Sequence, residues 1–111
     1  MKITEYGIDL GIVFDNGNVL YDYHEQDCCE HNYADWEQLE KHALNYNFDE
    51  ETFKIIPNDY GFRFGDKNRT FFIPCYSEQN GEYSYRITII YEDKSGKTLK
   101  EINTECERAE E

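Results

Sequence analysis

Alternating apolar and polar residues predict several β-strands along this chain. Residues 7–24 alternate on both sides of Asn16-Gly17, a dipeptide that favours a tight turn, so they are predicted to form a β-hairpin. Pro74 lies within a later strand pattern and favours an edge position or a bulge there, because proline has no amide proton for the ladder. The further predicted strands cover residues 59–64, 70–76, 85–91 and 97–104.

One stretch has helical spacing instead. Trp36, Leu39 and Ala43 recur at intervals of three and four residues, and Asp35 with Gln38 resembles a capping box. These features predict a helix over about 35–46. The predicted fold is therefore α+β, a mainly antiparallel sheet of five to six strands with one principal helix packed on one face. A further turn is expected from Asp49 to Lys54, before Pro57.

The length of 111 residues predicts a single domain over residues 1–111, with a charged tail at 105–111 that frays. The first residues contain no apolar signal region, which predicts a cytoplasmic protein with reduced cysteines. Adjacent cysteines at 28 and 29 also disfavour a simple disulfide framework.

The charge balance shows that the predicted domain is strongly acidic. Asp and Glu number 24 against 11 Lys and Arg, a net charge of -13. Such a field repels nucleic acid and anionic membranes, so direct binding to either is not expected. A basic protein surface is the favoured partner instead. The acids are densest in residues 22–50, where Lys41 is the only Lys or Arg.

The segment from His24 to His31 concentrates the ionisable chemistry. Two of the three histidines, two of the four cysteines and three carboxylates lie in these eight positions. Imidazole and thiolate are preferred zinc ligands, so His24, Cys28, Cys29 and His31 form a candidate metal site. The alternative is structural, with both cysteines packed as small apolar side chains. Catalysis by a cysteine is disfavoured because the surrounding carboxylates oppose thiolate formation.

The acidic segment is also a candidate docking surface. Its carboxylates can steer a basic partner and pair with it, while interleaved aromatic rings supply anchors that lose water on binding. The alternative is an ordinary solvated surface. The candidate partner-binding residues are Asp22, Glu25, Asp27, Glu30, Asp35, Glu37 and Glu40, with Tyr33 and Trp36 as anchors.

The run His24-Glu25-Gln26-Asp27-Cys28-Cys29-Glu30 resembles the His-x-Gln-Asp-Cys-Cys-Glu motif of an uncharacterised family of small bacterial and phage proteins. The resemblance covers about a quarter of the chain and implies a phage or mobile-element context, and thus the host-cell cytoplasm. It implies no enzymatic activity. In general character the chain is similar to phage inhibitors of host defence nucleases, including anti-CRISPR proteins that mimic nucleic acid. The sequence therefore predicts a non-enzymatic inhibitor that docks on a basic nucleic-acid-binding surface, with a small zinc-binding module as the alternative.

Overall fold

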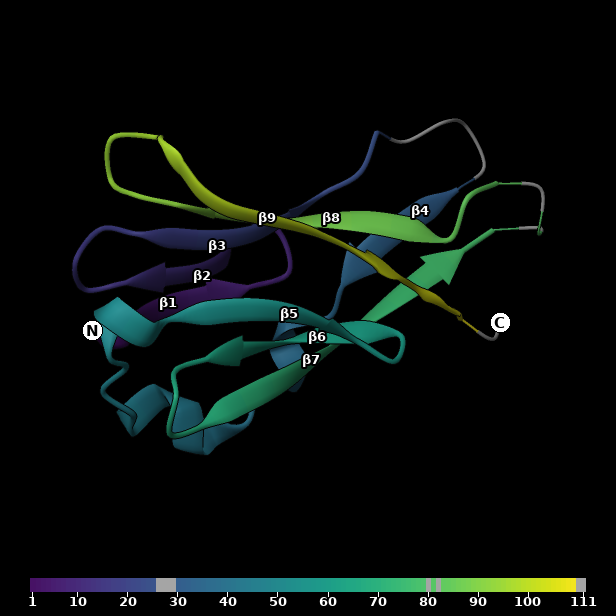
Figure 1. Ribbon diagram of the computed structural model, residues 1–111. Helices are drawn as coiled ribbons and strands as arrows, with labels where there is room; N and C mark the ends of the chain where they lie inside the picture. The colour runs from purple at the N-terminus through teal and green to yellow at the C-terminus, as the bar shows by residue number, and fades with distance from the viewer. Residues whose placement is uncertain (26–29, 80, 82, 110–111) are drawn as a thin grey trace.

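The computed structural model describes residues 1–25, 30–79, 81 and 83–109, which fold into two stacked β-sheets (Figure 1). The strands are β1 (Ile3–Gly7), β2 (Gly11–Phe14), β3 (Val19–Tyr23), β4 (His31–Ala34), β5 (Lys54–Asn58), β6 (Gly61–Gly65), β7 (Thr70–Glu78), β8 (Arg86–Glu92), β9 (Thr98–Glu105) and β10 (Glu107–Arg108). The first sheet has the order β1-β2-β3-β8-β9. The second has the order β10-β7-β6-β5, and β4 also pairs with β7. The described chain is a β-sandwich.

The core lies between the two sheets and follows the period of the strands. Along β7, Phe71, Ile73 and Cys75 are buried and alternate with partly exposed residues. On the facing sheet, Ile87 and Ile89 of β8 are buried in the same hydrophobic cluster. Side chains two apart along a strand share one face, so each strand contributes every second residue to the core.

The predicted principal helix is absent, and the α+β prediction is wrong. Residues 35–46 contain two short 3₁₀ helices, η1 (Trp36–Gln38) and η2 (Lys41–Asn45), and a third, η3 (Glu50–Thr52), follows. The described residues contain no α-helix. The apolar positions that suggested a helix, Trp36, Leu39 and Ala43, are buried, but the backbone between η1 and η2 is extended at Leu39 and Glu40.

Contacts with the strands fix the chain just before η1. The amide of Asp35 donates to the Pro74 carbonyl, at 2.8 Å, and the Ala34 amide donates to the Asp22 carboxylate, also at 2.8 Å. The Gln38 side chain bonds to the Asp35 carboxylate, so the Asp35 side chain caps no helix amide. Without the reciprocal bonds of a capping box, the first turn closes as a 3₁₀ helix.

Several strand predictions are confirmed, and others need correction. The hairpin around Asn16-Gly17 is β2 and β3, and Gly17 has a φ of 89°. Residues 8–10, expected in its first strand, form a turn instead, because the chain reverses there from β1 into β2. Pro74 lies in an interior strand and not at an edge, one residue beyond the last β4 pair, Ala34 with Cys75. Part of the predicted frayed tail is β10, which pairs in parallel with β7.

Candidate functional site

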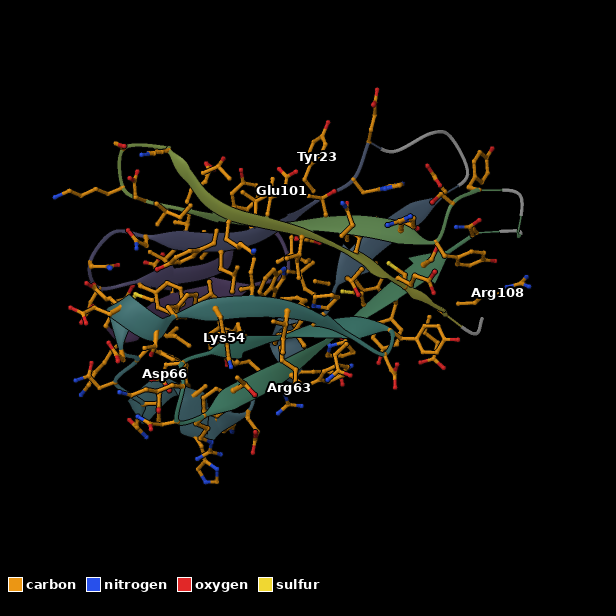
Figure 2. The ribbon with its side chains drawn as sticks, in the orientation of Figure 1. Tyr23, Lys54, Arg63, Asp66, Glu101 and Arg108 are labelled. Carbon is orange, nitrogen blue, oxygen red and sulfur yellow. The ribbon has the colours of Figure 1, made fainter. Side chains whose placement is uncertain are left out.

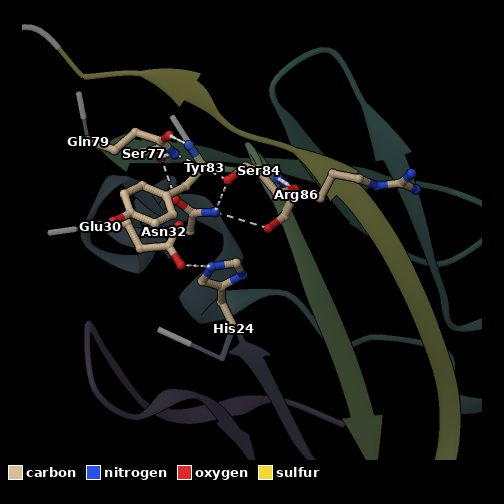
Figure 3. Close-up of polar contacts among 8 residues, drawn as sticks. All are labelled: His24, Glu30, Asn32, Ser77, Gln79, Tyr83, Ser84 and Arg86. Carbon is tan, nitrogen blue, oxygen red and sulfur yellow. Dashed lines mark hydrogen bonds and ion pairs between the residues drawn. The ribbon is translucent and has the colours of Figure 1, made fainter. Parts of the chain in front are cut away.

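The described ends of the cysteine motif meet in a buried pair. His24 follows β3 and Glu30 precedes β4, and His24 Nε2 lies 3.1 Å from Glu30 Oε1 (Figure 3). The His24 side chain is 15% exposed and the Glu30 side chain 3%. Asp27, Cys28 and Cys29 lie outside the described residues. The pair ties the end of β3 to the start of β4 on either side of them.

A buried polar network lies next to this pair (Figure 3). The Asn32 amide donates to the carbonyls of Ser84, at 2.9 Å, and Arg86, at 3.1 Å. The Ser77 hydroxyl donates to the Asn32 side-chain carbonyl, and Gln79 Nε2 donates to Ser77 Oγ at 2.6 Å. Connected hydrogen bonds of this kind offset the cost of burying amide and hydroxyl groups. The network therefore holds β4, β7 and the start of β8 in one arrangement.

The two histidines of the predicted zinc site lie on opposite faces of β4. Glu30, which contacts His24, and Asn32 lie on the inner side of the strand, whereas His31 alternates to the outer side. The His31 ring stacks on Tyr33 with 4.8 Å between ring centroids. Among the described residues, no three His, Cys, Asp or Glu side chains are placed to hold a metal. A zinc site therefore stays a prediction, and His31 does not converge with His24 on one ion.

The other two cysteines form a buried thiol pair in the core. Cys75 lies on β7, and Cys106 lies between β9 and β10. A hydrogen bond with Cys106, followed by burial, raises the pKa of the Cys75 thiol well above its ordinary value. A raised pKa keeps this sulfur protonated at neutral pH, so Cys75 is a core residue and not an activated nucleophile.

Three predicted partner-binding residues belong to the interior. Trp36 is fully buried against Phe62, with 5.4 Å between ring centroids. Asp22 accepts from Trp36 Nε1 at 3.0 Å and from the Ala34 amide at 2.8 Å. Glu30 is buried beside His24. A docking partner cannot contact the Trp36 or Glu30 side chain in this fold, and the Asp22 carboxylate is already bonded between β3 and the chain after it. These three residues are therefore not part of a docking surface.

The remaining predicted acids do not share one surface. Glu25 lies beside Tyr23 at the end of β3, in the upper layer of Figure 1. Asp35, Glu37 and Glu40 lie in and around η1, which follows β4 of the second sheet. Sequence proximity within residues 22–50 suggested a single acidic surface. The chain crosses from one sheet to the other between β3 and β4, and this crossing separates the acids.

Asp35, one of the acids near η1, lies beside a tyrosine pair. Tyr33 of β4 and Tyr76 of β7 lie with ring centroids 6.0 Å apart on the outer face of the second sheet. The Tyr33 hydroxyl lies 3.5 Å from Glu78 Oε1, and Gln38 Nε2 bonds both the Tyr76 hydroxyl and the Asp35 carboxylate. We call this the acidic tyrosine surface. Its residues are Tyr33, Asp35, Tyr76 and Glu78, which the contacts above join, and we include with them the exposed Glu37 and Glu40 that follow Asp35 in the chain.

The electrostatic environment of Tyr33 reflects these neighbours. Burial, and then the carboxylates of Glu78 and Asp35, raise the pKa of Tyr33 above its ordinary value. A negative local field disfavours the phenolate and favours an approaching cation. Tyr76 and Glu78 were not predicted as site residues, because they lie on β7, far from Tyr33 in the chain. Glu78, for example, is 45 positions from Tyr33. The alternation of residues 70–78 places them on a common outer face, but it does not reveal β4 as the neighbour.

The comparisons with known proteins give the chain no relatives. No family model matches it, and no curated protein and no solved structure is significantly similar. The class defined by the fold is a small acidic β-sandwich, and the resemblance to the cysteine-motif family stays a prediction. Among the described residues, no helix is long and apolar enough to cross a membrane.

Proposed function

We propose that this chain is a non-enzymatic binding protein that docks its acidic tyrosine surface on a basic, nucleic-acid-binding surface of a partner protein. A DNA-cleaving nuclease is the partner class we favour, so the chain would act as an inhibitor that competes with DNA. The observation that carries the proposal is the contact chain from Glu78 through Tyr33, Tyr76 and Gln38 to Asp35. It joins aromatic rings and carboxylates on one outer face.

The carboxylates of this surface are largely available to a partner. Glu37, Glu40 and Glu78 are exposed. Glu40 has the only ion pairs at this surface among the described residues, at 3.9 Å from Arg69 and 3.8 Å from His42, and its side chain is 59% exposed. Exposed pairs this long contribute little to stability, so exchanging them for partner cations costs little. With a net charge of -13, long-range attraction also favours a basic partner.

The tyrosines supply the apolar part of the contact. Tyr33 and Tyr76 line a surface pocket of about 390 Å³ together with Arg108, which Figure 2 shows at the edge of the second sheet. Half-buried tyrosines suit a binding surface because the ring can lose its remaining water while the hydroxyl keeps a hydrogen bond. Interfaces commonly depend on a few such anchors surrounded by polar residues. Arg108 would lie at the rim.

The direct test is binding to purified DNA-cleaving nucleases at increasing NaCl concentration, with and without competing duplex DNA. Affinity should fall as salt rises, and duplex DNA should displace the chain, because both compete for the same basic groove. The double variant Glu37→Lys/Glu40→Lys should bind more weakly, and Tyr76→Ala should dissociate faster.

A matched control separates local charge from net charge. Glu5 and Asp9 are exposed near the turn between β1 and β2, in the other sheet. The double variant Glu5→Lys/Asp9→Lys changes the net charge by the same amount and should bind nearly as well as the wild type. Equal losses in both double variants would show that only net charge matters. An affinity that changes neither with NaCl concentration nor with competing duplex DNA would rule out the proposal.

A further inference from the structure

Two adjoining hollows lie away from the acidic tyrosine surface, and they share Arg86 and Asn103. One, of about 410 Å³, also contains Tyr60 and Glu105, and the other, of about 430 Å³, also contains Tyr23. Arg86 lies on β8 and Asn103 on β9, in neighbouring paired strands. The hollows therefore join into one open groove, which runs from the end of β3 to the turn between β5 and β6.

The rims of this groove hold the most exposed large apolar side chains in the described part of the chain. Tyr23 is 57% exposed and Tyr60 is 52% exposed. Figure 2 shows Tyr23 projecting from the upper layer. Seven other aromatic rings of the described residues, among them Phe62 and Phe64, are buried in the core. A tyrosine held in water offers a flat ring face and a polar tip to a ligand.

Tyr60 occupies a backbone position that suits glycine. It is the only non-glycine residue among those described with a positive φ, at 54°. It is the second residue of the two-residue turn that joins Asn58 of β5 to Gly61 of β6. A bulky side chain is strained in this region, and such strain is concentrated at functional sites. Folding alone would favour glycine, so the ring at the groove rim needs another explanation.

Donors and acceptors line the floor between the two rings. Within the described residues, the Arg86 guanidinium makes no hydrogen bond and no ion pair. Asn103 Oδ1 accepts from the Thr88 hydroxyl at 2.8 Å, which leaves the Asn103 amide hydrogens for a ligand. The exposed carboxylates of Asp59 and Glu105 add acceptors. The groove thus offers both kinds of hydrogen-bonding group.

We propose that this groove binds a short neutral oligosaccharide. The C–H faces of pyranose rings stack on exposed aromatic rings, and their hydroxyls both donate and accept, which matches Tyr23 and Tyr60 flanking Arg86, Asn103 and Glu105. An anionic ligand is opposed by the net charge of -13. A lipid chain is opposed by the polar floor. This site is independent of the nuclease-binding proposal, because it shares no residue with the acidic tyrosine surface.

The test is titration of the ¹⁵N-labelled chain with cellopentaose, chitotetraose, maltopentaose and mannopentaose at millimolar concentrations, followed by NMR amide shifts. At least one of these sugars should shift the amides of residues 58–60, 86 and 103–105. Absence of shifts with all four would overturn the proposal. Tighter binding of trigalacturonate than of any neutral sugar would also overturn it, by identifying an anion site instead.

The variants separate binding from folding. Tyr60→Gly should weaken sugar binding about tenfold. The same change should leave the melting temperature unchanged or raise it, because glycine relieves the positive φ. Tyr23→Ala should weaken binding similarly, whereas Tyr6→Ala is the control, since Tyr6 is 37% exposed on β1 and lines neither hollow. Undiminished affinity in Tyr60→Gly would place any sugar site elsewhere and refute the assignment.

Discussion

Replacement of Asp66 by alanine should strongly destabilise the fold. Asp66 follows β6 and is 2% exposed (Figure 2). Its carboxylate accepts from the Tyr46 hydroxyl at 2.9 Å, the Asp49 amide at 2.9 Å, the Asn68 amide at 2.9 Å and the Arg69 amide at 3.0 Å. One side chain therefore joins the segment before η3 to the turn between β6 and β7.

The expected loss of unfolding free energy depends on which of the four donors can bond to water once the carboxylate is removed. Asn68 and Arg69 are exposed, so water replaces the carboxylate at their amides, whereas Tyr46 and Asp49 are half-buried and lose more. A hydrogen bond to a charged acceptor contributes about 1.5–3 kcal/mol, so two incompletely replaced bonds predict a loss of about 2–4 kcal/mol for Asp66→Ala. With a urea dependence of about 2 kcal/mol/M, the midpoint should fall by roughly 1–2 M.

The same carboxylate predicts a pH dependence. Burial alone would raise the pKa of Asp66, but the hydrogen bonds from Asp49, Asn68, Tyr46 and Arg69 together lower it below the ordinary value of 3.8. A lowered folded-state pKa means that the stabilisation is present above about pH 4 and is lost as pH falls through the folded-state value. Urea unfolding of Asp66→Asn should therefore lose less stability on acidification than unfolding of the wild type.

The control for these measurements is Asp9→Ala, since Asp9 is exposed and its side chain has no hydrogen-bond partner among the described residues. That variant should change stability by less than about 0.5 kcal/mol, as surface substitutions usually do. If Asp66→Ala costs no more than Asp9→Ala, the hydrogen bonds at Asp66 do not stabilise the fold and the reasoning fails.

Two further predictions concern the motif and its surroundings. Asp22→Ala should lower the free energy of unfolding in urea by about 2–4 kcal/mol, because it removes the acceptor of Trp36 Nε1 and of the Ala34 amide. Asp22→Asn should lower it less. Trp36 is the single tryptophan, so an unshifted fluorescence spectrum in Asp22→Ala would contradict the loss of this hydrogen bond. In native mass spectrometry with added zinc under reducing conditions, His31→Ala should retain any zinc adduct of the wild type, because His31 stacks on Tyr33. Loss of the adduct in His31→Ala would contradict the opposite-face geometry, and a wild type without an adduct would refute the zinc module.

Six of the ten described strands were predicted, because their alternation and turns are local, whereas β1, β4, β5 and β10 were not. Alternation along β7 and β8 reports which side chains face the core, and Asn16-Gly17 accepts the backbone angles of its turn. Charge is equally local, so the acidity of residues 22–50 follows from composition alone. The local pattern gave a wrong prediction at residues 35–46. The apolar side chains at helical spacing are buried as expected, but this spacing does not determine whether the backbone is an α-helix.

The tertiary structure decided how this segment lies, because residues 34–36 are hydrogen-bonded to strands that are distant in the chain. The Asp35 amide donates to the Pro74 carbonyl, and Trp36 Nε1 donates to the Asp22 carboxylate. Trp36, which was predicted as a surface anchor, is therefore held in the core. The candidate site depends on such contacts too. The pairing of β4 with β7 places Tyr33 beside Tyr76, and the crossing between sheets separates Glu25 from Glu37. Contacts between residues far apart in the chain leave no periodic signal along it. The sequence by itself therefore determined the alternating strands and the charge, and only the fold determined the remaining strands and which charged and aromatic residues meet.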